Sequence, residues 1–372
     1  MWRITINQVE QTNRIQHLQS SLRQNGIDCL LIGSPANRRY LSGFSGSAGW
    51  LAVFAAKAYL AVDFRYVEQA KRETNNLEIL HVKGDLSTWM PSTLLDNRAK
   101  RVGIEGEHVS VYLYLQLRKI CKEISNHIRI ISTQNVVESM RMFKDASEID
   151  NIQKAANISD MTMEFARSYC LREGITEKQL AWELESFMRE HNSESIPFEI
   201  IAASGANAAL PHAKPTDKII LKGEPITIDL GAKVNGYCSD VTRTFIIGQE
   251  DTTFNNIYNI VLGAQLFALS TIKAGMSGDS ADKIVRKIID DSGYSDAFGH
   301  GLGHGVGLET HELPRLSAAS NEILAENMVF TIEPGIYLSG WGGVRIEDTV
   351  TIKSERPMPV NHAPKIACIQ GG

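Results

Sequence analysis

Two aspartates, Asp229 and Asp240, flank a hairpin turn in the stretch ITIDLGAKVNGYCSDVTRTF. The pair Asn235-Gly236 predicts the turn, because both residues tolerate the positive φ angles that a two-residue hairpin loop requires. Folding the chain there places Asp229 opposite Thr242, with Asp240 two residues further along on the same face. Two carboxylates on one face can bind metal ions between them. The alternative is a pair of solvated strand aspartates.

A second acidic pair, Glu333 and Glu347, flanks the glycine-rich turn GWGG. A hairpin centred near Gly340 brings the two glutamates face to face, and Arg345 then lies on the same side as Glu347. Pro334 cannot donate a ladder hydrogen bond, so we expect the strand to be interrupted or at an edge just after Glu333. The alternative is a surface hairpin. However, the flanking segments VFTIE and GVRIED are apolar enough to be buried, and buried carboxylates need partners.

Three of the ten histidines, His300, His304 and His311, fall in the glycine-rich segment FGHGLGHGVGLETHELP between the two hairpins. The glycines disfavour a helix there and fit a backbone that packs tightly against a site. The segment does not match GxGxxG, so it indicates no dinucleotide site. One histidine would more often be structural, but three in one such loop favour a site. His212 in PHAKPT is a fourth candidate, although alone it is no better than any loop histidine.

The two acidic pairs and His304 together offer carboxylates and one imidazole as metal ligands. One divalent ion would leave two uncompensated negative charges in a partly buried site, which is costly. Two divalent ions would balance the charge and acidify a water bound between them, as in two-metal hydrolytic enzymes. Oxygen ligands with a single nitrogen favour Mn²⁺, with Co²⁺, Zn²⁺ and Fe²⁺ as alternatives.

The elements that must position these residues change in character near residue 138. Before it, we expect helices at 10–25, 64–74, 86–96 and 108–122 between strands at 28–33, 51–56, 58–62, 77–82, 101–105 and 128–132, with a loop from Ser34-Pro35 through LSGFSGSAGW. This alternation predicts an α/β domain. After it, we expect helices at 145–171, 176–191, 253–273 and 278–292, and strands at 198–203, 218–221, 225–232, 237–247, 328–333, 336–339, 344–353 and 366–369. Helix pairs alternating with hairpins predict an α+β domain with an antiparallel sheet covered by helices.

Composition excludes several classes of protein. The 372 residues carry a net charge of −5, which gives no basic footprint for nucleic acid. No apolar run approaches the ~20 residues that span a bilayer, and the N-terminal stretch lacks a signal-peptide core, so we expect a cytoplasmic protein without a membrane partner. The five cysteines form no CxxC pair, which argues against a disulfide framework and a thiolate zinc site. Cys238 is expected to pack in the interior, with a thiol ligand as the alternative.

The candidate ligands resemble, in identity and order, the metal-ligand set of the "pita-bread" metallopeptidases: Asp229, Asp240, His304, Glu333 and Glu347. That group includes methionine aminopeptidase, Xaa-Pro aminopeptidase (aminopeptidase P) and prolidase. The segments ASGANAALPHAKPT, IEPGIY and GGVRIEDTV add to the resemblance. NRRYLSGFSGSAG and VDFRYVEQA resemble the N-terminal domain of the aminopeptidase P, prolidase and creatinase branch. Methionine aminopeptidases lack that domain, and creatinase lacks the metal ligands.

This resemblance implies a creatinase/prolidase-like α/β domain over residues 1–137. It also implies a pita-bread catalytic domain with a pseudo-twofold repeat over residues 138–372. In the family's pattern Asp229 would chelate one metal, Asp240 and Glu347 would bridge both, and His304 and Glu333 would complete the second. A bridging hydroxide would attack the scissile carbonyl. The remaining implied roles are proton shuttle for Glu333, oxyanion stabilisation for His311, contact near the scissile nitrogen for His212, pocket lining for His300 and support behind the ligands for Arg345.

The implied activity is that of a dinuclear metal-dependent exopeptidase, an Xaa-Pro aminopeptidase, which acts as a homodimer on peptides with proline in the second position. A prolidase restricted to dipeptides is the alternative, because a blocked cleft would exclude longer substrates. A non-catalytic relative that binds proteins is a further alternative, but such relatives usually lose ligands and all five are present here. The C-terminal stretch ERPMPVNHAPKIACIQGG indicates no role.

Overall fold

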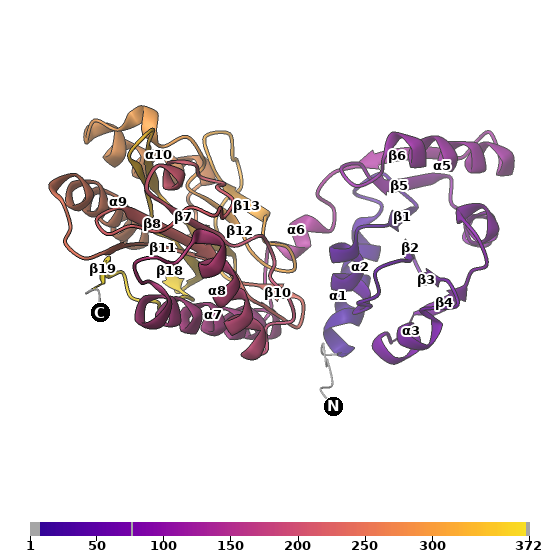
Figure 1. Cartoon of the computed structure of the whole chain (residues 1–372). Coiled ribbons are helices and arrows are strands. Elements are labelled where there is room, and N and C mark those ends of the chain that lie inside the picture. Colours follow the sequence, from indigo (N-terminus) through magenta and orange to yellow (C-terminus); the bar gives the residue numbers. More distant parts are fainter. Residues whose placement is uncertain (1–7, 76, 370–372) are drawn as a thin grey trace. The chain divides into compact units, whose positions relative to one another are not determined.

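The computed structural model describes residues 8–75 and 77–369. The chain divides into two compact units, and the boundary along the sequence lies between Arg141 and Met142 (Figure 1). The short helix α6 (Glu138–Arg141) therefore belongs to the first unit. Residues 1–7, which open the stretch without a signal-peptide core, and the last three residues of the C-terminal stretch lie outside the described residues. None of the helices within the described ranges has both the length and the apolar character needed to cross a membrane.

The first unit is built on one mixed sheet with strand order β4-β3-β2-β1-β5-β6. Its strands are β1 (Cys29–Ile32), β2 (Trp50–Phe54), β3 (Ala58–Val62), β4 (Glu78–His81), β5 (Arg101–Glu105) and β6 (Arg129–Thr133). Its other helices are α1 (Gln8–Ser21), α2 (Pro35–Ser42), α3 (Val67–Glu73), α4 (Met90–Asp96) and α5 (Val111–Ile124), with a 3-10 turn at Leu86–Thr88. The interior strands β1 and β3 are buried along their whole length, as expected for a sheet covered on both faces.

Helix α2 replaces part of the loop expected after Ser34. The Ser34 hydroxyl caps the helix by accepting a hydrogen bond from the Asn37 amide at 3.5 Å, and Pro35 occupies the first turn. Gly43 ends the helix with a φ of 75°. The Ser-Pro pair was expected in a loop, but it begins a helix because proline's fixed φ and missing N–H suit the first helical position.

The second unit contains two helix pairs and several sheets that are antiparallel except where β19 pairs in parallel with β11. Its helices are α7 (Ala146–Phe165), which continues as a π-helical turn (Ala166–Cys170), α8 (Glu177–Glu190), α9 (Thr252–Thr271) and α10 (Gly278–Asp291), with 3-10 turns η3 (Gly205–Ala209) and η4 (Ser295–Ala297). Its strands are β7 (Ile201–Ser204), β8 (Pro225–Leu230), β9 (Lys233–Val234), β10 (Tyr237–Cys238), β11 (Val241–Ile247), β12 (Gly303–Gly305), β13 (Glu312–Leu316), β14 (Val329–Ile332), β15 (Gly335–Leu338), β16 (Gly342–Arg345), β17 (Asp348–Lys353), β18 (Arg356–Pro359) and β19 (Cys368–Ile369).

These elements repeat the same order of helix pair and hairpin. Helices α7 and α8 pack against the sheet β19-β11-β8-β7, and α9 and α10 pack against the sheet β13-β12-β14-β17-β18. One apolar core lies within each half. The expected strand at 218–221 is wrong, because within the described part of the chain this segment forms only a single bridge between Thr176 and Ile219.

The aspartate hairpin, which runs from β8 to β11, has the register predicted from its turn. Val234 pairs with Tyr237, and Asp229 pairs with Thr242. Asn235-Gly236 supplies the turn with φ angles of 48° and 80°. The expected continuous strand over 237–247 is wrong in one respect, because it breaks between β10 and β11, where Asp240 lies.

The glutamate hairpin, which runs from β14 to β17, is centred on Gly340 as predicted. Ile332 pairs with Asp348 and Gly335 pairs with Arg345, so one register persists through the hairpin. The predicted interruption at Pro334 is confirmed, since β14 ends before Glu333 and β15 begins after Pro334. The opposite strand, expected to be continuous over 344–353, also breaks, and Glu347 lies in that break.

Candidate metal centre

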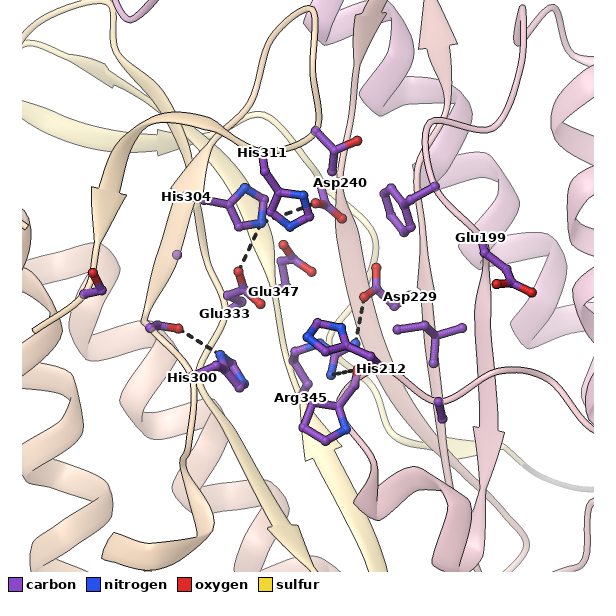
Figure 2. A pocket seen from close by; sticks show the side chains of 18 of the residues that line it. Glu199, His212, Asp229, Asp240, His300, His304, His311, Glu333, Arg345 and Glu347 are labelled. Atoms are coloured by element: carbon purple, nitrogen blue, oxygen red, sulfur yellow. Dashed lines mark hydrogen bonds and ion pairs between the residues drawn. The ribbon is translucent and has the colours of Figure 1, made fainter. Parts of the chain in front are cut away.

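A cavity of about 620 Å³ in the second unit brings together every site residue proposed from the sequence. Those residues are His212, Asp229, Asp240, His300, His304, His311, Glu333, Arg345 and Glu347. Figure 2 shows the carboxylates and imidazoles of both hairpins and of the histidine-rich loop turned toward one centre. Residues more than a hundred positions apart in the sequence therefore share a single site.

The densest part of the site holds Asp240, His304 and Glu347, whose ligand atoms all lie within 4.8 Å of one another. The His304 Nε2 atom is 3.7 Å from Asp240 Oδ2 and 3.3 Å from Glu333 Oε1. The other ring nitrogen, Nδ1, lies 3.1 Å from the Gly305 carbonyl oxygen. That contact orients the ring so that Nε2 faces the carboxylates.

His304 is held there by the short strand β12, and the glycines on either side of it explain the position. A Cβ atom at Gly303 would collide with the Thr331 backbone, and one at Gly305 would collide with the Leu313 backbone. Only glycine lets β12 pair this closely with its neighbours β13 and β14. The tight backbone packing expected from this glycine-rich segment is thus present, although the strand itself was not predicted.

Arg345 orients Asp229, one of the two aspartates of the cluster. Its guanidinium donates hydrogen bonds to Asp229 Oδ2 at 2.7 Å, to the Tyr337 hydroxyl at 2.8 Å and to Thr242 Oγ1 at 3.1 Å. The Tyr337 hydroxyl also lies 2.9 Å from His300 Nε2. A continuous hydrogen-bonded chain therefore links His300 to Asp229 through one buried arginine.

Two threonine hydroxyls orient the glutamates. Thr242 donates a hydrogen bond to Glu347 Oε2 at 2.5 Å, and Thr331 donates one to Glu333 Oε1 at 3.0 Å. Neither threonine was a candidate site residue, and neither was Tyr337. The signal for Thr331 was available, because a residue two positions before Glu333 lies on the same strand face. Nothing in the sequence pattern pointed to Tyr337.

The electrostatics of the cluster favour a bound cation. Burial, reinforced by the neighbouring carboxylates, raises the pKa of Asp240 and of Glu347 well above the usual values. Burial also raises the pKa of Asp229, although Arg345 opposes it. For Glu333 burial acts in the same upward direction, but the hydrogen bond and charge of His304 outweigh it and lower the pKa to about 2. Carboxylates that repel one another in this way are stabilised by added positive charge.

The unused lone pairs agree with a metal site. Among the described residues, Asp229 Oδ1 and Glu347 Oε1 are buried without a hydrogen-bond partner. Buried oxygens of this kind are rare in proteins unless an ion or water satisfies them. The donor set of carboxylates and one imidazole therefore fits hard divalent cations.

The remaining histidines border the cluster. The ring of His311 lies 4.1 Å from the ring of His304, measured between centroids. Burial, followed by the neighbouring His304, lowers the pKa of His311 to about 4. Figure 2 shows His212 on the opposite side of the cavity, beside Arg345 and Asp229. His311 and His212 thus place imidazoles on two sides of the carboxylates.

Cys238 does not share this arrangement. Its amide donates to the Gly307 carbonyl at 2.7 Å, and its thiol lies 3.8 Å from the Leu308 carbonyl oxygen. Burial raises the pKa of the thiol to about 11, so it is protonated at neutral pH. Cys238 packs behind the histidine-rich loop, and its place supports the packing interpretation over the thiol ligand.

The C-terminal stretch, for which the sequence indicated no role, braces the back of the site. Arg243 donates to the backbone carbonyl of Glu347 at 2.5 Å and pairs with Asp348 at 2.6 Å. Lys365 binds the other oxygen of Asp348 at 2.6 Å, and the Ala363 carbonyl accepts from Arg243 at 2.7 Å. The tail therefore lies against the charged side chains that join the two hairpins.

Comparison with known proteins agrees with this architecture. Residues 150–354 match the profile of metallopeptidase family M24, and residues 14–143 match that of the creatinase/prolidase N-terminal domain. The chain is 39% identical to the Xaa-Pro dipeptidase of Pyrococcus furiosus over 340 residues, which cover 91% of this chain and 94% of that protein.

Two solved structures extend the similarity. The Xaa-Pro dipeptidase from Bacillus anthracis superposes with a TM-score of 0.92 at 38% identity, covering 96% of this chain and 99% of that one. The X-Pro aminopeptidase from Thermotoga maritima MSB8 superposes with a TM-score of 0.85 at 38% identity, covering 94% and 100%. The resemblance to the pita-bread metallopeptidases, the two-domain fold and the prediction of an enzyme are confirmed. The chain belongs to metallopeptidase family M24, and is a hydrolase that uses divalent metal and carries a creatinase/prolidase-type N-terminal domain.

Proposed function

We propose that the protein is a dinuclear Xaa-Pro aminopeptidase, which removes the first residue from peptides with proline in the second position. One observation carries this proposal. Two carboxylates from each hairpin and one imidazole converge in a single cavity, and two of the carboxylate oxygens lack a partner among the described residues. The similar proteins named above as acting on Xaa-Pro peptides support the substrate class.

The number of metal ions follows from charge. Asp229, Asp240, Glu333 and Glu347 would carry four negative charges when ionised, and Arg345 offsets one of them through Asp229. With Arg345 counted, two divalent ions leave one positive charge, which a bound hydroxide would cancel, whereas a single ion leaves one buried negative charge. We propose Mn²⁺, with Co²⁺, Zn²⁺ or Fe²⁺ as alternatives, because the donors are mainly oxygen. When bound, the two ions would supply an acidic water and polarise the scissile carbonyl.

The protein's own groups would assist in defined ways. Glu333 Oε1 lies 3.3 Å from His304 Nε2, and its carboxylate would accept a proton and deliver it to the departing nitrogen. His311 is neutral, and a neutral imidazole can donate one N–H to the oxygen that becomes negative during attack. His212 reaches the cavity from the opposite wall, which suits contact near the scissile nitrogen. His300 lines the cavity and is held by Tyr337.

The cavity wall next to His212 suits a proline ring. Phe198, Ile201, Pro211 and Ala213 line this side with apolar surface. A rigid five-membered ring placed there would lose little conformational entropy on binding. The apolar wall thus supports proline as the second residue of the substrate.

A prolidase restricted to dipeptides is the second candidate. The observation that favours it is a positive charge on the cavity wall, since Arg315 lines the same cavity. A dipeptide would end close to the metal centre, where its terminal carboxylate could pair with such a group. In a longer peptide the carboxylate would lie further away.

The test compares substrates after metal removal and reloading. Under the proposal, protein treated with a chelator loses activity by about 1000-fold or more, since metals supply several kcal/mol of transition-state stabilisation. Two equivalents of Mn²⁺ per chain restore it. The dipeptide Ala-Pro and the tripeptide Ala-Pro-Ala then separate the two candidates. Equal use of both favours the aminopeptidase, and use of Ala-Pro alone favours the prolidase. Undiminished turnover in verified metal-free protein would refute the metal mechanism.

We also propose a homodimer, as expected from the resemblance. Sedimentation equilibrium of the full chain measures its mass directly, and a species of about 41.2 kDa, the mass of one chain, would contradict the proposal.

A further inference from the structure

A buried carboxylate outside the metal cluster, that of Glu177, binds several donors at once. Its Oε1 atom accepts hydrogen bonds from the amide and hydroxyl of Ser204 at 2.7 and 3.0 Å. Its Oε2 atom accepts from the amide and hydroxyl of Thr216 at 3.0 and 2.6 Å. The side-chain amide of Asn207 lies 3.2 and 3.0 Å from the two oxygens. Glu177 is fully buried at the start of α8, so these donors replace water around its charge.

The donors belong to one loop, and that loop carries His212. Ser204 begins the segment at the end of β7, Asn207 lies in the turn η3, and Thr216 ends the segment. His212 lies between them and lines the cavity. The backbone adds two more bonds, because the amide of Glu177 donates to the Lys218 carbonyl and that of Lys178 donates to the Thr216 carbonyl, both at 3.1 Å. One carboxylate thus joins both ends of a substrate-facing loop.

The other side of the loop rests on the glutamate hairpin. Cβ atoms at Gly342 and Gly343 would meet the backbone oxygens of Gly205 and Ala208, so β16 and the loop are in close backbone contact. Arg345, at the end of β16, donates to the Pro211 carbonyl at 3.4 Å. In Figure 2 His212 lies directly beside Arg345 and Asp229. The loop is therefore held between Glu177 and the strand that supports a metal ligand.

The buried carboxylate of Glu177 ties the loop to one position. Among the contacts described for it, Lys218 does not bind this carboxylate; its ammonium group binds Ser204 Oγ at 2.9 Å and Glu224 at 2.5 Å. If the loop moved, the Glu177 carboxylate would lose the donors from Ser204, Asn207 and Thr216. Leaving a buried charged acceptor without partners is far more costly than losing an ordinary contact. The loop is therefore restricted to the conformation in which its tip faces the cavity.

We propose that Glu177 is a positioning residue for the peptidase reaction, which acts by holding the His212 loop against the cavity. This inference rests on the proposed function for the role of His212. The position of the loop itself does not depend on that function. Glu177 touches neither substrate nor metal, and its effect passes through the backbone of residues 204–216.

The first experiment compares Glu177→Gln with Glu185→Gln in the Mn²⁺-loaded protein. Both changes remove one carboxylate from α8, but Glu185 is partly exposed and bonds only Arg189 among the contacts described for it. Glutamine at 177 places an NH₂ group where Ser204 or Thr216 also donates. Amide hydrogen exchange over residues 204–216 should become at least 10-fold faster in Glu177→Gln and stay unchanged in Glu185→Gln. Unchanged exchange in Glu177→Gln would overturn the inference, whatever the protein hydrolyses.

The second experiment measures whether the effect passes through His212. We expect Glu177→Gln to lower kcat/KM for Ala-Pro-containing peptides by about 10- to 100-fold, as small displacements of positioned groups do, with unchanged metal content. In a His212→Ala background the same change should have almost no further effect. Equal losses in both backgrounds would show independent action and overturn the inference. Failure of the wild-type protein to cleave Xaa-Pro peptides would instead refute the proposed function.

A milder pair of variants covers the case in which Glu177→Gln fails to fold. Thr216→Val removes the hydroxyl that donates a hydrogen bond to Glu177 Oε2, whereas Thr216→Ser retains it. We expect faster exchange of the loop and a several-fold loss of kcat/KM in Thr216→Val, with recovery in Thr216→Ser. Identical behaviour of the two variants would contradict the role of the carboxylate.

Discussion

The aspartate hairpin and the glutamate hairpin both direct carboxylates into the cavity, but their strands do so with different geometry. In the aspartate hairpin, Asp229 lies within strand β8 and only Asp240 lies in a break. In the glutamate hairpin, both Glu333 and Glu347 lie in breaks between strands. Each hairpin nevertheless keeps one register from end to end. The breaks therefore aim individual side chains into the cavity without shifting the pairing, as bulges and interruptions do near active sites.

The difference matters because each hairpin orients a candidate ligand of the other hairpin. Arg345 of the glutamate hairpin binds Asp229, and Thr242 of the aspartate hairpin binds Glu347. Arg243 adds a bond from the aspartate hairpin to the Glu347 carbonyl. Neither hairpin alone presents a complete set of oriented ligands, so the site depends on the two halves packing correctly.

The largest effect is expected from removing a ligand of the aspartate hairpin. Asp240→Asn deletes a charge at the centre of the cluster, where His304 and Glu347 lie closest. We expect metal content to fall by one or more ions per chain and activity to fall by about 100-fold or more, because the metal supplies several kcal/mol of stabilisation. Elemental analysis and turnover measure the two effects, with the surface change Asp150→Asn as control. Full metal content with full activity would show that Asp240 is not a ligand.

The next effect concerns the support that the glutamate hairpin gives to Asp229. Arg345→Lys keeps the positive charge but cannot bind Asp229, Tyr337 and Thr242 together, because lysine lacks the planar fork of arginine. We expect metal affinity to weaken by about 10- to 100-fold, the usual cost of losing a group that orients a ligand. A competition titration with a metal indicator measures it. Wild-type affinity in this variant would mean that Asp229 is oriented without the other hairpin.

The reverse support, from the aspartate hairpin to Glu347, should be weaker. Thr242→Val keeps the shape of the side chain but removes the hydroxyl, which donates to Glu347 Oε2 and also accepts from Arg345 Nε. The loss of one hydrogen bond to a carboxylate predicts metal binding weaker by about 10-fold, or ~1.5 kcal/mol. The same titration applies, and Thr242→Ser, which retains the hydroxyl, should bind metal like the wild type. If Thr242→Val weakened metal binding more than Arg345→Lys does, the aspartate hairpin would give Glu347 more support than the glutamate hairpin gives Asp229.

The smallest effect is expected at Cys238, which belongs to the aspartate hairpin but is not among the residues that line the cavity. Cys238→Ala should leave metal content and kcat unchanged and lower the stability by ~1 kcal/mol, because it removes one buried sulfur atom. Thermal denaturation and elemental analysis measure both. Loss of a metal ion would restore the thiol-ligand alternative.

Much of this site followed from local rules. The pair Asn235-Gly236 set the register that opposes Asp229 and Thr242, and the centre at Gly340 did the same for the glutamates. Turn chemistry and the two-residue period of strands act over a few residues, so sequence reveals them. The same local rules failed at Ser34-Pro35, where one dipeptide suits both a loop and a helix start.

The sequence by itself therefore determined which residues are the candidate ligands, their order and the face of each hairpin on which they lie. Only the tertiary structure decided where the strands break, how Arg345 and Thr242 support ligands across the hairpins, and how Lys365 reaches Asp348 behind the site. The same holds for Glu177, which resembled an ordinary helix-start residue and binds both ends of the His212 loop. These contacts join segments that are distant in the sequence. Their formation depends on which sheet each strand enters and on how the two halves pack, and no local pattern of residues encodes that.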